Sequence, residues 1–174
     1  MTSQIRQIKT PIEKQQIAKD VLSQLPDWFG IPEAITEYVD HAQRLPLWAV
    51  IINEQIIVGF ATVKKSSPDT AEIDVMGILP MYHRQGLGRQ LIHTITGYSR
   101  QHGYSLLQVK TVAEGHYLAY DKTNQFYQAM GFKKTGNFSD IVGHVESMSS
   151  VCHAFIVRRK ISDSVIITIM GSKH

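Results

Sequence analysis

The sequence is poor in cysteine and contains no long apolar run. Cys152 is the only cysteine among 174 residues, so no disulfide can form within the chain. The longest apolar runs, Leu47–Ile52 and Val165–Met170, have the length of strands, whereas a membrane helix needs roughly 18 apolar residues. Residues 1–10 lack the apolar core of a signal peptide. We therefore expect a cytoplasmic protein without a membrane partner.

Charge and histidine patterns argue against two further classes of protein. The net charge is only +3 and no block of Lys and Arg forms a basic patch, so we expect no nucleic-acid partner. The eight histidines are scattered without the pair spacing of a helical metal site, so we expect no metal. The 43% of hydrophobic and 19% of charged residues are typical of a globular chain, and we expect one domain over residues 1–174.

Hydrophobic periodicity predicts a mixed sheet with helices packed on it, an α/β (α+β) fold. Thr10 can cap the first helix, with Glu13 completing a capping box. The predicted helices are Pro11–Leu25, a segment after Pro32 with Ile35, Val39 and Ala42 on one face, Gly86–Gln101, and Ala119–Met130 with Ala119, Thr123, Phe126 and Met130 on one side. The predicted strands are Ile5–Lys9, Leu47–Ile52, Gln55–Lys64, Ala71–Leu79, Ser105–Val112, Phe132–Phe138, Val151–Arg158 and Val165–Met170.

One strand-to-helix junction carries the strongest functional signal. A predicted strand runs into a short loop containing Gly86 and Gly88 and then into a helix. Glycines let the backbone turn sharply and approach a bound group closely. The first N–H groups of a helix lack internal partners and carry partial positive charge, so they suit phosphate oxygens. Arg84 and Arg89 add positive charge to this candidate phosphate site.

Two familiar phosphate-binding motifs do not fit the junction. A P-loop requires Gly-Lys followed by Ser or Thr, whereas Arg89 and Gln90 follow Gly88. A dinucleotide fingerprint needs a third glycine at the position where this chain has Leu91. That fingerprint also follows the first strand of a βαβ unit, whereas the loop here lies in mid-chain after a meander of three predicted strands. A plain strand-to-helix turn, with glycines for geometry alone, remains the alternative.

With a second motif downstream, the junction resembles the GNAT acetyltransferase superfamily. The family's acetyl-CoA loop reads Arg/Gln-x-x-Gly-x-Gly/Ala, and this chain has His83-Arg84-Gln85-Gly86-Leu87-Gly88, with His83 departing from the first position. Downstream, Phe126-Tyr127-Gln128-Ala129-Met130-Gly131-Phe132 is similar to the family's Tyr-x-x-x-Gly-Phe signature. The resemblance covers residues 55–138 and implies a mostly antiparallel central sheet flanked by helices.

The resemblance also implies an N-acetyltransferase with acetyl-CoA as cosubstrate. Loop amides would hold the pyrophosphate, the N–H of Ile78 would polarise the thioester carbonyl, and Tyr127 would be the general acid that protonates the CoA sulfur. The family's asparagine near the pantetheine falls on Tyr120, and Asn124 is a weaker substitute. The implied cofactor-binding residues are Ile78, Leu79, His83, Arg84, Gln85, Gly86, Leu87, Gly88, Arg89, Asn124 and Tyr127.

Two carboxylates are candidates for the base that takes the amine proton. Glu72 and Asp74 are spaced by two on the strand that leads to the loop, so they share a face. Glu72 stands where the histone-acetyltransferase branch of the superfamily carries its glutamate base. The alternatives are a solvated strand face for both carboxylates and solvent as the proton acceptor.

The acceptor is expected to be a primary amine of a small molecule or peptide, whose identity the sequence does not give. Trp28, Phe29 and Trp48 either line its site or pack in the core. An exposed late strand offers an edge to a second copy of the chain, so a homodimer is a candidate assembly. The alternative function is a non-catalytic CoA-binding sensor or interaction module on the same fold.

Overall fold

The computed structural model describes residues 2–137 and 152–158. The chain divides into two compact units, Met1–Val109 and Lys110–His174, and each is described by itself. Within the described residues, no helix combines the length and the apolar character that a membrane span requires.

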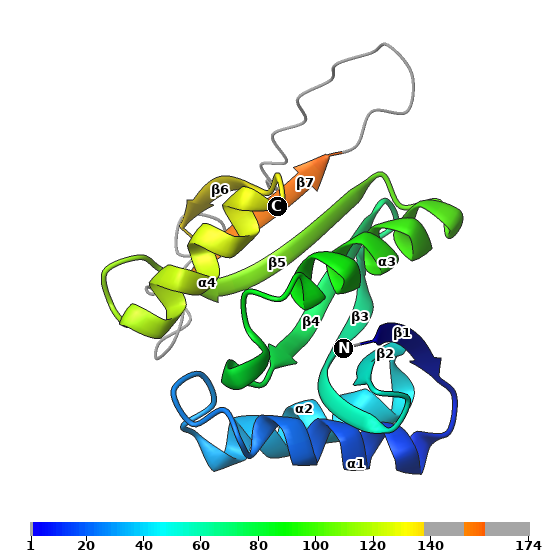
Figure 1. The fold of residues 1–174 in the computed structure, drawn as a ribbon. Helices are drawn as coiled ribbons and strands as arrows, with labels where there is room; N and C mark the ends of the chain where they lie inside the picture. The colour runs from blue at the N-terminus through cyan, green and yellow to red at the C-terminus, as the bar shows by residue number, and fades with distance from the viewer. Residues whose placement is uncertain (1, 138–151, 159–174) are drawn as a thin grey trace. The chain divides into compact units, whose positions relative to one another are not determined.

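The first unit is built on a mixed sheet (Figure 1). Its strand order is β1-β2-β3-β4-β5. The first four strands pair antiparallel in sequence order, and β5 pairs parallel to β4, which confirms the predicted mixed and mostly antiparallel sheet. The strands are β1 (Ser3–Ile8), β2 (Leu47–Ile52), β3 (Ile56–Ser67), β4 (Thr70–Ile78) and β5 (Leu106–Val112), of which residues 106–109 belong to this unit.

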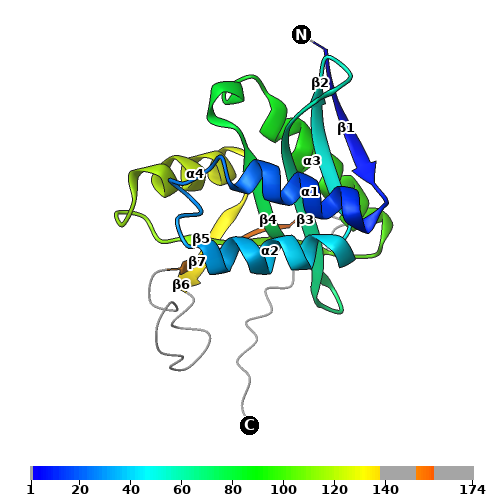
Figure 2. The same cartoon turned by 90° about the horizontal axis from the view of Figure 1, so that it is seen from below.

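Helices cover both faces of this sheet, with α1 (Pro11–Leu22) and α2 (Pro32–Arg44) together on one face (Figure 2). Every residue of β2 is buried, as expected for a strand between two helical layers. Leu47, Ala49 and Ile51 join the core under α1 and α2. The alternate residue Trp48 packs on Tyr98 of α3 (Leu87–Gln101), with ring centroids 4.7 Å apart.

The two N-terminal helices follow the sequence signals with one difference. Thr10 is the N-cap of α1, but its hydroxyl bonds the Glu13 carboxylate (3.2 Å) and caps no backbone N–H. The predicted capping box is therefore replaced by a side-chain pair. Lys14 of α1 donates to the carbonyl of Leu45 (2.8 Å), just after α2 ends. A cation at the C-terminus of a helix complements the helix dipole, so this bond fixes the end of α2.

Strand β4 contains a bulge halfway along. Val75 lies opposite Thr62 and Ile73 lies opposite Val63, so Asp74 is an extra residue on β4. The parallel ladder with β5 pairs Thr70–Ile73 of β4 with Leu106–Val109. Bulges end regular pairing and redirect side chains, and they are common next to active sites.

Beyond the bulge, β3 and β4 approach each other closely at Gly59. A Cβ atom at Gly59 would lie 2.6 Å from the carbonyl oxygen of Gly77 and 3.0 Å from the Cα of Ile78. We therefore expect Gly59→Ala to lower the free energy of unfolding by about 1–3 kcal/mol, because backbone atoms must move. Urea denaturation measures the change. Gly97→Ala is the control, because a Cβ at Gly97 would meet nothing within 4 Å, and an equal loss in both variants would contradict the close approach.

The second unit contains α4 (Leu118–Ala129), β6 (Lys133–Asn137) and β7 (Cys152–Arg158), with β6 and β7 antiparallel. The predicted helix and both strands are confirmed. The side of α4 that carries Ala119, Thr123, Phe126 and Met130 is half-buried, and the buried residues of the helix are Asn124 and Tyr127. The predicted strand Val165–Met170 lies outside the described residues.

Candidate functional site

The junction predicted to bind phosphate is a strand, one turn of 3-10 helix over Pro80–Tyr82, a short loop and α3. Gly86 is the N-cap of α3 at φ 81°, and Arg84 also has a positive φ of 60°. A Cβ on Gly86 would meet nothing within 4 Å, so glycine is needed here for conformation and not for space inside the protein. The first backbone bond of the helix runs from the N–H of Gln90 to the carbonyl of Gly86 (3.1 Å).

The loop side chains are exposed around this helix start. His83, Arg84, Gln85 and Arg89 are all exposed, whereas Leu87 is buried and anchors the helix to the sheet. The N–H groups of residues 87–89 precede the first intrahelical donor, so they are available to an anion. The helix start therefore offers free backbone amides, with the exposed arginines Arg84 and Arg89 nearby in the sequence.

Strand β4 ends beside this loop with backbone groups turned away from β3. The N–H of Leu79 donates to Val58 (2.8 Å), and Ile78 lies opposite Gly59. Antiparallel alternation therefore turns the N–H and C=O of Ile78 to the other edge of β4. His83 Nε2 donates to that carbonyl (2.7 Å) and so ties the loop to the strand.

The same alternation identifies a residue that the sequence interpretation did not include. Met76 lies opposite Ala61, two residues before Ile78, so its backbone N–H and C=O also point away from β3. The two-residue period of the strand could have indicated Met76 once Ile78 was chosen, whereas the bulge at Asp74 could not be read from the sequence.

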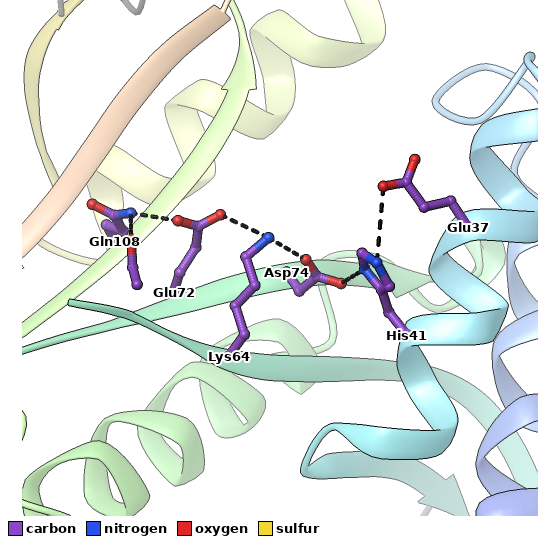
Figure 3. A network of polar contacts seen from close by, with 7 residues as sticks. Glu37, His41, Lys64, Glu72, Asp74 and Gln108 are labelled. Atoms are coloured by element: carbon purple, nitrogen blue, oxygen red, sulfur yellow. Dashed lines mark hydrogen bonds and ion pairs between the residues drawn. The ribbon is translucent and has the colours of Figure 1, made fainter. Parts of the chain in front are cut away.

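The two candidate carboxylates lie on one face of β4 and share a lysine (Figure 3). Lys64 Nζ is 3.3 Å from Glu72 Oε1 and 2.6 Å from Asp74 Oδ1. Burial alone would lower the pKa of the Lys64 ammonium, but Asp74 and Glu72 outweigh it and raise that pKa above its ordinary value. Lys64 therefore stays charged at neutral pH between the two carboxylates.

Glu72 and Asp74 have different further partners. Glu72 is 3% exposed, and its second oxygen accepts a hydrogen bond from the side-chain amide of Gln108 on β5. The Asp74 side chain is 2% exposed, and its second oxygen lies 3.1 Å from Nδ1 of His41 on α2. Neither carboxylate is on a solvated strand face, so that alternative interpretation is wrong.

In the second unit, Tyr127 is buried on α4 at 5% exposure and packs against Phe132, with ring centroids 5.4 Å apart. Burial, with a smaller contribution from Tyr120, raises the pKa of the Tyr127 phenol well above its ordinary value. Its hydroxyl therefore keeps its proton at neutral pH. Asn124, one turn earlier, is fully buried, and its Nδ2 donates to the carbonyl of Val112 (2.9 Å).

Sequence and structural comparisons identify the family. The family model described as an acetyltransferase (GNAT) domain matches residues 43–134, more than half of the chain. The chain belongs to the GNAT acetyltransferase family. Among curated proteins, none matches the sequence.

Solved structures share the fold of this GNAT chain at low sequence identity. A GNAT-family protein from Desulfovibrio desulfuricans gives a TM-score of 0.71 at 17% identity, with 90% of this chain and 99% of that chain covered. The ribosomal-protein-S18-alanine N-acetyltransferase from Escherichia coli gives a TM-score of 0.65 at 16% identity, and the match covers 95% of this chain and 100% of that chain. A GNAT family acetyltransferase from Elizabethkingia anophelis was solved with acetyl-CoA bound. It gives a TM-score of 0.64 at 19% identity, and the match covers 90% of this chain and 98% of that chain. At these identities the likeness shows the fold.

Within this GNAT chain, the structure brings the loop residues and the end of β4 together through the His83 bond to Ile78. Trp28 lies against His83 (ring centroids 5.9 Å apart), so the segment between α1 and α2 contacts the loop. Phe29 packs on the α1 core, and Trp48 is a core residue under α3. Among residues 2–137 and 152–158, no group of three or more His, Cys, Asp or Glu side chains could hold a metal ion.

Proposed function

We propose that this GNAT-family protein transfers the acetyl group of acetyl-CoA directly to a primary amine of a small molecule or peptide. The observation that carries the proposal is that two backbone segments lie side by side. The start of α3 at Gly86 presents N–H groups without helical partners, and the backbone groups of Ile78 at the end of β4 point away from β3. The family supports acetyl transfer, and two structural neighbours were solved with acetyl-CoA bound.

In this proposal, the amides at the start of α3 bind the CoA pyrophosphate, with Arg84 and Arg89 adding charge. Backbone groups at the end of β4 pair with the pantetheine arm, and the N–H of Ile78 polarises the thioester carbonyl. The amine nitrogen attacks that carbonyl carbon, the N–C bond forms and the C–S bond breaks. Tyr127, which holds its proton at neutral pH, gives that proton to the leaving thiolate.

The sequence offers Glu72, Asp74 or solvent as acceptor of the amine proton. In the structure, Lys64 contacts one Glu72 oxygen and Gln108 bonds the other. Both contacts stabilise the carboxylate as an anion and occupy the atoms that a base would use. Glu72 acts as the base only if one of these contacts opens when the acceptor binds.

The direct test is binding followed by turnover. We expect acetyl-CoA to bind in isothermal titration calorimetry, and free CoA thiol to appear in a colorimetric assay when an accepted amine is added. The panel contains peptides with a free α-amine, peptides with an internal lysine, polyamines and aminoglycosides. Binding without turnover of any amine would instead support a CoA-binding sensor, and absence of binding would contradict the proposal.

A further inference from the structure

Helix α2 contributes a histidine to the polar network on β4 (Figure 3). His41 Nδ1 lies 3.1 Å from Asp74 Oδ2, and Asp74 is the extra residue of the β4 bulge. The Asp74 side chain is 2% exposed while that of His41 is 32% exposed. The buried carboxylate of Asp74 thus contacts one ring nitrogen of His41, while the His41 side chain remains partly exposed to solvent.

We propose that His41, oriented by Asp74, is the general base that takes the proton from the acceptor amine. This inference rests on the proposed acetyl transfer. It adds a catalytic residue from α2 that the sequence motifs do not include. Asp74 is a positioning residue that acts through His41.

The hydrogen bond selects the tautomer that a base requires. Asp74 also contacts the charged Lys64 at 2.6 Å, so its carboxylate is ionised and can only accept hydrogen bonds. His41 Nδ1 must therefore carry the hydrogen, which leaves a lone pair on Nε2 in the neutral ring. Nε2 lies 3.8 Å from the nearest Glu37 oxygen, beyond hydrogen-bond distance, so that lone pair is available to an amine.

The surrounding charges also favour the product of proton transfer. Glu37, one turn earlier on α2, faces Nε2, and Asp74 faces Nδ1. Once Nε2 is protonated, the imidazolium lies between two carboxylates, while the positive charge of Lys64 is shared by Asp74 and Glu72. This stabilisation appears only as the ring gains its proton.

Fixed supports hold His41 against β4. The Lys14 bond to Leu45 fixes the end of α2, and the neighbouring Ala42 is buried in the core. Asp74 lies four residues before Ile78 on the same strand, and the backbone N–H of Ile78 points away from β3. Through Asp74, His41 is therefore held to the strand whose end is proposed to bind the thioester.

The step balances without another reactant. The amine nitrogen forms the bond to the acetyl carbon and loses one proton to His41 Nε2. The C–S bond breaks, and the sulfur takes the proton of Tyr127. His41 then releases its proton to solvent, Tyr127 regains one, and the products are the N-acetylated amine and CoA with a free thiol.

The test compares His41→Gln and Asp74→Asn with the parent on the best amine of the panel, measuring kcat/KM across pH. We expect both variants to bind acetyl-CoA normally and to lose at least about tenfold in kcat/KM, because general base catalysis is typically worth 10²–10⁴-fold and solvent replaces part of it. His93→Gln, at an exposed histidine of α3, is the matched control and should behave as the parent.

Further readouts separate a base from a structural role. Added imidazole should restore turnover to His41→Ala, and ¹⁵N-histidine NMR of the parent should place the His41 hydrogen on Nδ1 and not on Nε2. Equal rates for His41→Gln and His93→Gln, a loss without imidazole rescue, or an Nε2–H tautomer would each overturn the assignment. If Glu72→Gln alone carries a defect that grows at acidic pH, Glu72 is the base. If the parent acetylates no amine, the proposed function itself fails and the role of His41 fails with it.

Discussion

Gly86→Asp is expected to abolish acetyl-CoA binding while the protein stays folded. Gly86 caps α3 with its backbone at φ 81°, and its missing Cβ faces open space and not protein atoms. An aspartate there would place a carboxylate where the pyrophosphate is proposed to lie, and it would compete for the amides at the helix start. Juxtaposed like charges cost several kcal/mol, so we expect the Kd in calorimetry to rise at least about 100-fold.

The substitution also strains the backbone, and a matched control separates the two effects. Gly103 follows the other end of α3 at φ 79°, and a Cβ there also meets nothing within 4 Å. Gly103→Asp should carry a similar strain of about 1–2 kcal/mol without approaching the cofactor loop. We expect both variants to lose comparable thermal stability and only Gly86→Asp to lose binding. Normal acetyl-CoA affinity in folded Gly86→Asp would remove the cofactor from this loop.

The sequence predicts the elements of this fold well because their signals are local. The uninterrupted apolar run of β2 and the proline and glycine boundaries of α1 and α3 fix those elements within a few residues. The sequence did not predict the full burial of Asn124 on α4, because this side chain is polar. Its burial is offset by a bond to the carbonyl of Val112, twelve residues away, and no local pattern contains such a partner.

The candidate site likewise has one part that the sequence predicts and one part that it does not. The glycine loop is a continuous motif, so the sequence locates it without a structure. The pairing of His41 with Asp74 joins residues 33 positions apart, and it depends on a bulge that alters the register of β4. Alternation alone places Glu72 and Asp74 on one face, but it does not show that Lys64 lies between them or that α2 supplies a histidine.

Tyr127→Phe is expected to lower kcat at least about tenfold while leaving the Kd for acetyl-CoA unchanged, because only the proton donated to the thiolate is lost. The pKa of Tyr127 lies above its ordinary value because of burial, so the hydroxyl stays protonated as the pH rises through about 10, the ordinary tyrosine value. The parent kcat should therefore show no decline from this group up to that pH. Tyr117→Phe, at a 60% exposed tyrosine at the start of the same helix, is the control. Single-turnover thiol release isolates the chemical step, and equal rates for parent and Tyr127→Phe there would leave Tyr127 with a structural role and not a catalytic one.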